Sequence, residues 1–159
     1  MTSKPTTHTL PHEQGMRTPP WLYEEMCRLM GVAKFALDAF GSAENSMCSV
    51  YCDVEANGLV LPWIDPTFCN PPFSLMTAVV DKAIAEKIRV GLIGPAGCSQ
   101  KWFQKLLRHA VVYFPDKRLQ FHEPDGSLKK GAMSDTAVYI IMSGREFTTP
   151  DTRILHVPR

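Results

Sequence analysis

The sequence predicts one α/β domain with a mostly parallel sheet, an antiparallel edge and flanking helices. Helix-like and strand-like segments alternate along most of the chain, which is the pattern of layered α/β folds. The length of 159 residues suits a single domain of this kind. Asp38, Asn70 and Pro95 stand at the carboxyl ends of three predicted strands, where such sheets bind ligands. We therefore expect these positions to share one edge of the sheet.

The spacing of apolar residues and the positions of capping residues, glycine and proline predict the elements of the first half of the chain. Residues 18–31 predict a helix, with Thr18 as its cap, Pro19 and Pro20 at its start and Gly31 at its end. The apolar run at 35–40 predicts a buried strand. A turn and a short helix are expected within 41–51. Residues 66–69 predict a brief strand, which two prolines end.

The second half of the chain continues the alternation. Ser74 is the expected cap of a helix at 74–87, whose apolar side chains recur at helical spacing. The run VGLIGP predicts the clearest buried strand, at 90–95. An amphipathic helix follows at 99–110, and further strands are expected at 111–115, 118–121 and 136–142.

Composition restricts the class of protein. Apolar residues make up 45% and charged residues 21%, which excludes a disordered chain, a collagen-like fibre and a coiled coil. No window approaches the ~18 apolar residues of a membrane span, and the N-terminus lacks a secretory apolar segment. Five cysteines without a Cys-x-x-Cys pair favour free thiols, no metal site and a cytoplasmic protein.

The chain divides into three parts. Residues 1–16 are polar and lack periodicity, so we expect a flexible N-terminal arm. The predicted domain covers 17–145, and 146–159 is expected to be a C-terminal tail.

The segment Asn70-Pro71-Pro72-Phe73 carries the strongest chemical signal. The Asn70 side-chain oxygen and the Pro71 carbonyl are two acceptors, and an exocyclic NH2 group has two donors. The proline rings fix the direction of that carbonyl, and Phe73 offers a flat face to a planar base. The segment therefore predicts a pocket for an aromatic amine.

An ordered series of motifs resembles the phage-type DNA adenine-N6 methyltransferases, which use S-adenosylmethionine. The asparagine-diproline-aromatic segment resembles the catalytic motif of amino-group methyltransferases, and the series covers about residues 17–142. Its members are Thr18-Pro19, Leu37-Asp38, Asn45, Gly58-Leu59 with Trp63, Asn70 to Ser74, Pro95-Ala96 with Trp102-Phe103, and Arg118-Leu119-Gln120-Phe121.

This resemblance implies a Rossmann-like methyltransferase fold and a set of site residues. It implies that the catalytic motif is Asn70, Pro71, Pro72 and Phe73. The implied contacts to S-adenosylmethionine are Thr18, Pro19, Asp38, Ala39, Asn45 and Asn70. The chain departs from the family at the glycine-rich loop, where Ala39-Phe40-Gly41-Ser42 keeps one glycine. Asp53 and Glu55 are the candidates for the acidic residue that holds the cofactor ribose.

The resemblance also implies the reaction and its partner. We expect methylation of the N6 amine of a flipped-out adenine at specific sites in double-stranded DNA, by a monomer or homodimer. The location would be a host cytoplasm if the protein is phage-encoded. Cytosine N4 is an alternative target, since it is also an exocyclic amine. An inactive DNA-binding module of the same fold is another alternative.

A local excess of basic residues predicts where DNA is bound. Residues 101–131 contain seven Lys and Arg against three Asp and Glu, although the whole chain has a net charge of +1. The predicted DNA contacts are Lys101, Trp102, Lys105, Lys129 and Lys130. A solvated helix face remains the alternative for Lys101 and Lys105, and a core position is the alternative for Trp102. Asp38 and Asn45 have alternatives as a helix cap and a plain helix residue.

Overall fold

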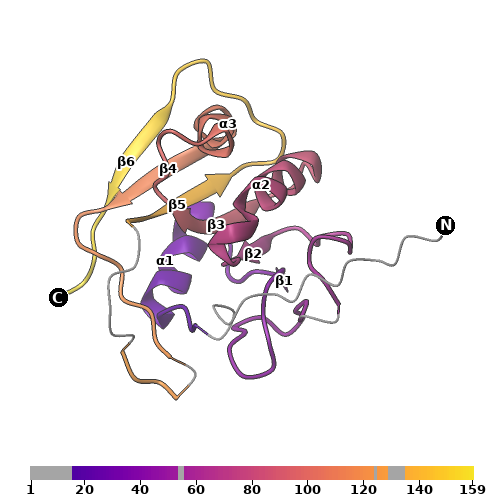
Figure 1. Ribbon diagram of the computed structural model, residues 1–159, viewed down its shortest axis with the longest axis vertical. Helices are drawn as coiled ribbons and strands as arrows, with labels where there is room; N and C mark the ends of the chain where they lie inside the picture. The colour runs from indigo at the N-terminus through magenta and orange to yellow at the C-terminus, as the bar shows by residue number, and fades with distance from the viewer. Residues whose placement is uncertain (1–15, 54–55, 124, 129–134) are drawn as a thin grey trace.

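A six-stranded sheet forms the centre of the molecule (Figure 1). The structure is a computed structural model, and it describes residues 16–53, 56–123, 125–128 and 135–159. The strands lie in the order β1 (Leu37–Asp38), β2 (Thr67–Cys69), β3 (Val90–Pro95), β5 (Thr136–Ile141), β4 (Ala110–Pro115) and β6 (Asp151–Leu155). All of them point the same way except β5, which is antiparallel to both of its neighbours.

The antiparallel strand lies inside the sheet, so the expectation of an antiparallel edge is wrong. Residues 137–141 of β5 are buried, because β3 and β4 cover its two sides and helices cover its faces. The run Ala-Val-Tyr-Ile-Ile suits such a position, since strands buried on both faces lack polar alternation.

Two hydrophobic clusters lie on opposite faces of the sheet. Helix α1 (Pro20–Met30) covers one face, and α2 (Met76–Ala85) and α3 (Lys101–His109) cover the other (Figure 1). Successive residues of β5 alternate between them: Tyr139 and Ile141 join the cluster of α2 and α3, while Val138 and Ile140 join that of α1. The sheet therefore positions its carboxyl edge between two packed layers.

Several local expectations are corrected at helix starts. Helix α1 starts after Pro19, which makes no side-chain cap, and the Thr18 hydroxyl has another partner described below. The Ser74 cap is also wrong, because Ser74 lies in the short 3-10 helix η2 (Phe73–Leu75) and α2 starts at Met76 without a side-chain cap. Gly31 ends α1 as expected.

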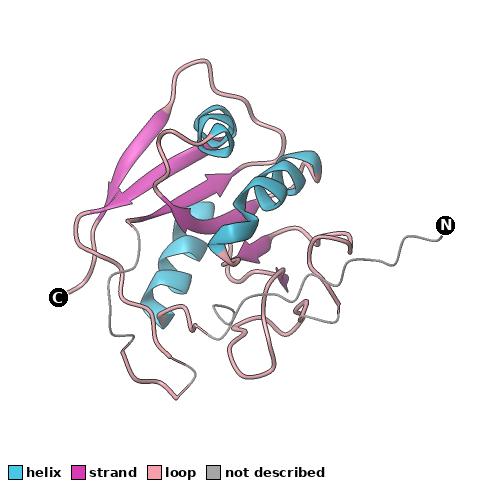
Figure 2. Ribbon diagram, viewed as in Figure 1, coloured by secondary structure: helices cyan, strands magenta, loops and turns pink. Residues whose placement is uncertain are grey.

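Two expected elements are missing, and an unexpected strand takes part in the sheet. Residues 41–51 contain turns in place of the short helix (Figure 2). Residues 118–121 form no strand, because their backbone pairs with no neighbouring strand of the described residues. Leu119 and Phe121 nevertheless bury their side chains in the α1 cluster. Strand β6 falls in the segment expected to be a tail, and it pairs in parallel with β4.

The loop before β2 packs closely against β1. A Cβ atom on Gly58 would lie 1.9 Å from the carbonyl oxygen of Ala39, so this approach requires glycine. Trp63 is buried and its Nε1 donates a hydrogen bond of 2.6 Å to the Gly58 carbonyl. These contacts hold the loop beside the carboxyl end of β1.

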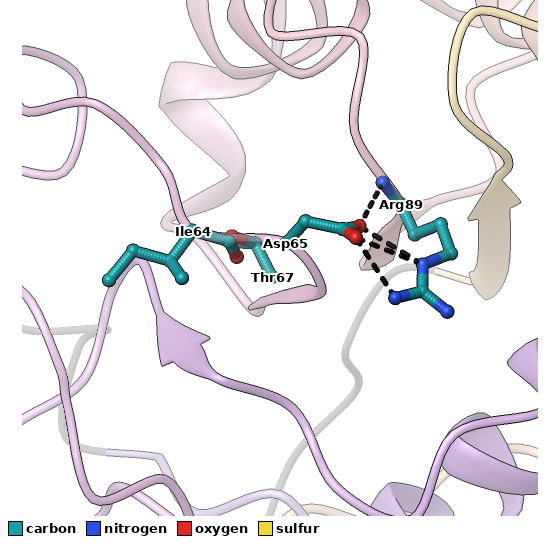
Figure 3. A network of polar contacts seen from close by, with 4 residues as sticks. All are labelled: Ile64, Asp65, Thr67 and Arg89. Carbon is teal, nitrogen blue, oxygen red and sulfur yellow. Dashed lines mark hydrogen bonds and ion pairs between the residues drawn. The ribbon is translucent and has the colours of Figure 1, made fainter.

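The opposite, amino edge is fixed by a polar network (Figure 3). The backbone N–H of Arg89 donates to Oδ1 of Asp65 at 2.8 Å, and the guanidinium donates to both carboxylate oxygens. This pairing lowers the pKa of Asp65. The Thr67 hydroxyl donates to the Ile64 carbonyl at 2.7 Å. The network ties the segment entering β2 to the residue before β3.

None of the helices in the described ranges has the length and apolar character of a membrane span.

Candidate active site

The carboxyl ends of β1, β2 and β3 place the three expected positions at one edge. These strands are parallel neighbours, with Asp38 opposite Phe68 and Cys69 opposite Leu92. Asp38 is the last residue of β1, Asn70 follows β2 directly, and Pro95 ends β3. The shared edge is therefore confirmed.

The Asn70 amide is oriented by one hydrogen bond. Its Nδ2 donates to the hydroxyl oxygen of Thr18 at 3.1 Å, across 52 residues of sequence. Thr18, Pro71 and Pro72 are buried, so the diproline corner does not face solvent. Within the part of the chain that the structure describes, Asn70 Oδ1 accepts no hydrogen bond. This arrangement leaves the oxygen able to accept a hydrogen bond from a bound molecule.

Asp38 is a buried carboxyl group that the following turn encloses. Only 4% of the residue is exposed, and this burial raises its pKa to about 6. The Phe40 backbone N–H donates to Oδ1 at 3.1 Å, and this bond and the nearby Ser46 hydroxyl offset part of the rise in the pKa. A Cβ atom on Gly41 would lie 2.8 Å from Oδ2, so the single glycine of this loop is required for the enclosure.

Ala39 and Asn45 stabilise the same turn. Ala39 is buried, and its N–H donates to the Phe68 carbonyl at 3.0 Å. Asn45 Oδ1 accepts a hydrogen bond of 2.7 Å from the N–H of Ser42. Both residues thus shape the backbone that surrounds Asp38.

A cavity of about 320 Å³ connects the Asp38 turn with the Asn70 hydrogen bond. Its lining includes Thr18, which accepts the hydrogen bond from Asn70, and Ser46, which lies beside Asp38 at Gly41. Asn45 and Glu44 line the same cavity. Asp38 and Asn70 are not among its lining residues.

Arg17 also lines this cavity, although it is not among the residues expected from the sequence. Its Nε is buried and has no hydrogen-bond partner, the one such side-chain atom among the described residues. A buried cationic donor without an acceptor is costly, which suits a site that receives an anionic group. No sequence pattern marks Arg17, because its backbone pairs with His122, which is distant in the sequence.

A second cavity, of about 380 Å³, lies beside the residues that follow the diproline corner. Phe73, Pro95 and Trp102 line it, together with the polar residues Ser74, Thr77 and Gln100. Trp102 is 8% exposed, so it combines a largely buried ring with a place in the wall of this cavity. The buried hydroxyl of Tyr139 donates to the Pro95 carbonyl at 2.6 Å and holds that wall in place.

The remaining candidates have different surroundings. Lys101 is exposed at the first turn of α3, whereas Lys105 forms a 2.5 Å ion pair with Asp81 of α2. Lys129 and Lys130 lie outside the described residues. Asp53 accepts a hydrogen bond from the N–H of Ala56, and Glu55 lies outside the described residues. Pro19 is buried at the start of α1.

The cysteines and histidines do not gather into a metal centre in the parts of the chain that are described, where no group of three or more His, Cys, Asp or Glu is suitably arranged. All five cysteines are free, and Cys98 alone is exposed.

One comparison identifies a family. The family model described as DNA N-6-adenine-methyltransferase (Dam) matches residues 6–159 of the chain. The chain has no significant match among curated proteins or among solved structures.

Proposed function

Because this chain belongs to the DNA N-6-adenine-methyltransferase (Dam) family, we propose that it methylates the exocyclic N6 of a flipped-out adenine at specific sites in double-stranded DNA. The methyl donor in this proposal is S-adenosylmethionine. The observation that carries it is the Asn70 amide, which Thr18 holds by Nδ2 while Oδ1 remains able to accept a hydrogen bond. The strand order, with β5 inserted in an otherwise parallel sheet, supports a Rossmann-like methyltransferase fold.

The chemistry of the cavity beside Thr18 fits the proposed cofactor. S-adenosylmethionine ends in a carboxylate and an ammonium group, and the cavity offers the guanidinium of Arg17, whose Nε is unsatisfied, and the carboxylate of Glu44. The proposed cofactor contacts are Thr18, Pro19, Asp38, Ala39, Asn45 and Asn70, to which we add Arg17. Of these, Arg17, Thr18 and Asn45 line the cavity directly. When bound, the cofactor supplies a methyl group that its sulfonium makes electrophilic.

The chain's own contribution to the reaction is to orient the amine. Asn70 Oδ1 and the Pro71 carbonyl accept hydrogen bonds from the two N–H groups of the amine. These bonds favour the pyramidal form of the amine, whose lone pair can attack the methyl group. The same two oxygens face the positive charge that develops on nitrogen. Phe73 lines the cavity beside the corner and offers its ring to the base. Alignment of this kind contributes up to ~7–11 kcal/mol to a reaction of two bound molecules.

No described residue is assigned as a general base. The amine proton passes to water after methyl transfer, when the nitrogen is more acidic.

The target base must leave the duplex to reach the diproline corner, because that corner is buried. Lys101, Lys105, Lys129 and Lys130 are the proposed phosphate contacts, with Trp102 beside the base. Lys101 and Trp102 are favoured by their position next to the Phe73 cavity. The protein acts as a monomer or homodimer in this proposal.

The deciding experiment uses labelled S-adenosylmethionine and DNA of mixed sequence, followed by nucleoside analysis. We expect the label in N6-methyladenine. Label found only in N4-methylcytosine would reassign the target base. DNA binding without cofactor binding in calorimetry would instead indicate an inactive module.

A further inference from the structure

A third cavity continues the carboxyl edge beyond the candidate site. It has a volume of about 280 Å³ and lies between the ends of β3 and β4 and the start of β5. Ala96 lines it, while the flanking Pro95 and Gly97 line the cavity beside Phe73. The Ala96 N–H donates to the Asp135 carbonyl at 2.8 Å, which extends the pairing of β3 with β5. One short stretch of backbone therefore separates the two cavities.

Two adjacent cations, Lys117 and Arg118, line this third cavity. Lys117 is exposed and forms no salt bridge with the residues that the structure describes. Arg118 lies 3.8 Å from the Asp135 carboxylate, and the two side chains are 58% and 87% exposed. An ion pair so long and so exposed contributes little, so the guanidinium can exchange this carboxylate for a stronger anion.

The backbone that carries these cations is anchored on both sides. The preceding Asp116 donates its N–H to Leu155 of β6 at 2.9 Å, and its carboxylate accepts from Val157 N–H and from His156 Nδ1. The following Leu119 is buried in the α1 cluster. The cations thus extend from a fixed segment, which reduces the ordering cost of binding a ligand.

Another group of basic residues lacks these properties. Lys105, Arg108 and His109 line a cavity of about 500 Å³ together with Asp81 and Glu146. Its carboxylates, Asp81 and Glu146, offset its cations, so of this group only Lys105 is a proposed phosphate contact, and a phosphate there would have to displace Asp81. The C-terminal residue of α3, His109, directly precedes β4, so this cavity lies toward the amino edge. Charge and position both favour the cavity of Lys117 and Arg118 for an extended anion.

We propose that Lys117 and Arg118 bind two backbone phosphates of the duplex next to the flipped-out base. The inference rests on the proposed function, since it extends the substrate from one base to the DNA on either side of it. Phosphate contacts fix the register and orientation of a protein on DNA without reading its sequence. The two cavities beside Ala96 then receive the base and the adjoining backbone.

The test compares two double variants, each of which removes two positive charges at one edge of the sheet. The variant Lys117→Gln/Arg118→Gln is compared with Lys34→Gln/Lys87→Gln, whose exposed lysines precede β1 and β3 at the amino edge. Anisotropy measures binding of a short fluorescent duplex between about 50 and 200 mM salt. Each lost phosphate contact reduces the slope of log K against log salt by about 0.9 and weakens binding roughly eightfold near 0.1 M salt.

We expect the carboxyl-edge variant to lose about 1.8 in slope and roughly 60-fold in affinity near 0.1 M salt, while the amino-edge variant keeps the wild-type slope. Equal losses in both variants, or no loss in either, would overturn the proposal. Cofactor binding and methyl incorporation are measured alongside. Wild-type methylation with an unchanged slope in the carboxyl-edge variant refutes this inference alone, whereas a wild type that neither binds DNA nor methylates it refutes the proposed function as well.

Discussion

At the scale of single residues, the Asn70 amide is the group on which methyl transfer depends. We expect Asn70→Ala to reduce methyl transfer at least ~100-fold, because an acceptor aimed at developing charge is lost. Cofactor affinity should fall far less, because Asn70 is one of several proposed contacts and the Arg17 cavity remains intact. Single-turnover methylation and calorimetry measure the two effects separately.

The Thr18 hydroxyl provides a control for this prediction. Thr18→Ser keeps the oxygen that accepts the hydrogen bond from Asn70 Nδ2, so methylation should be retained. Thr18→Val removes this oxygen, so methylation should fall. Substantial methylation by Asn70→Ala would show that the amine is oriented by other groups.

Asp38 makes stability depend on pH. Its folded-state pKa of about 6 exceeds the ordinary value of 3.8, so the folded protein binds the proton more tightly than the unfolded chain. This contribution to stability is complete below pH 3.8 and is lost as pH rises through about 6. Relative to Asp38→Asn, the wild type should therefore lose ~3 kcal/mol of unfolding free energy between about pH 3.8 and pH 7.

Urea unfolding of both proteins across this range measures the effect. A difference between wild type and Asp38→Asn that does not change with pH would mean that the carboxyl group is not buried in the folded protein.

At the scale of elements, the loop before β2 depends on the absence of a side chain at Gly58. We expect Gly58→Ala to destabilise the fold by at least ~3 kcal/mol, because its Cβ would overlap the Ala39 carbonyl oxygen. Gly144→Ala is a matched control, since Gly144 has φ of +72° but no heavy atom within 4 Å of its Cβ position. The control should cost only about 1–2 kcal/mol.

Thermal and urea unfolding compare the two glycine variants. Similar losses in both would indicate that the loop moves away from β1 at little cost.

The sequence predicts elements well where apolar residues alone determine them. The apolar run of 90–95 and the helical spacing of 20–30 both fix their elements, because burial of apolar side chains supplies most of the driving force for folding there. Strand β6 could not be predicted, since residues 152–154 are exposed and lack the run of apolar side chains that marks a buried strand. Residues 118–121 were wrongly predicted as a strand. Their side chains alternate in burial as in a strand, but the backbone forms no ladder of hydrogen bonds with the described strands.

Some residues of the candidate site could be predicted from the sequence, and others could not. The motif of Asn70 to Phe73 is local, so its position after β2 could be predicted from the chain. The role of Thr18 as partner of Asn70 depends on a contact between distant segments, and so does the position of Arg17 with its unsatisfied Nε. A lone arginine beside a polar arm carries no periodic signal, so only the folded chain identifies it.

At the scale of the whole molecule, the C-terminal segment completes the sheet. Ending the chain at Thr149 removes β6, the buried Leu155 and the Val157 contact to Asp116. We expect a loss of about 2–4 kcal/mol from the buried side chains, together with aggregation through the exposed edge of β4.

The control truncation ends at Val157 and removes only the exposed Pro158 and Arg159. It should change stability by less than about 0.5 kcal/mol. Calorimetric unfolding and light scattering measure both effects, and equal behaviour of the two truncations would show that β6 is dispensable.

The insertion of β5 between β3 and β4 has a consequence for synthesis on the ribosome. Both neighbours precede β5 in the chain, yet neither pairs with the other, so their facing hydrogen-bonding groups have no partner until residues 136–141 emerge. A nascent chain that stalls before this point presents two open strand edges to other chains.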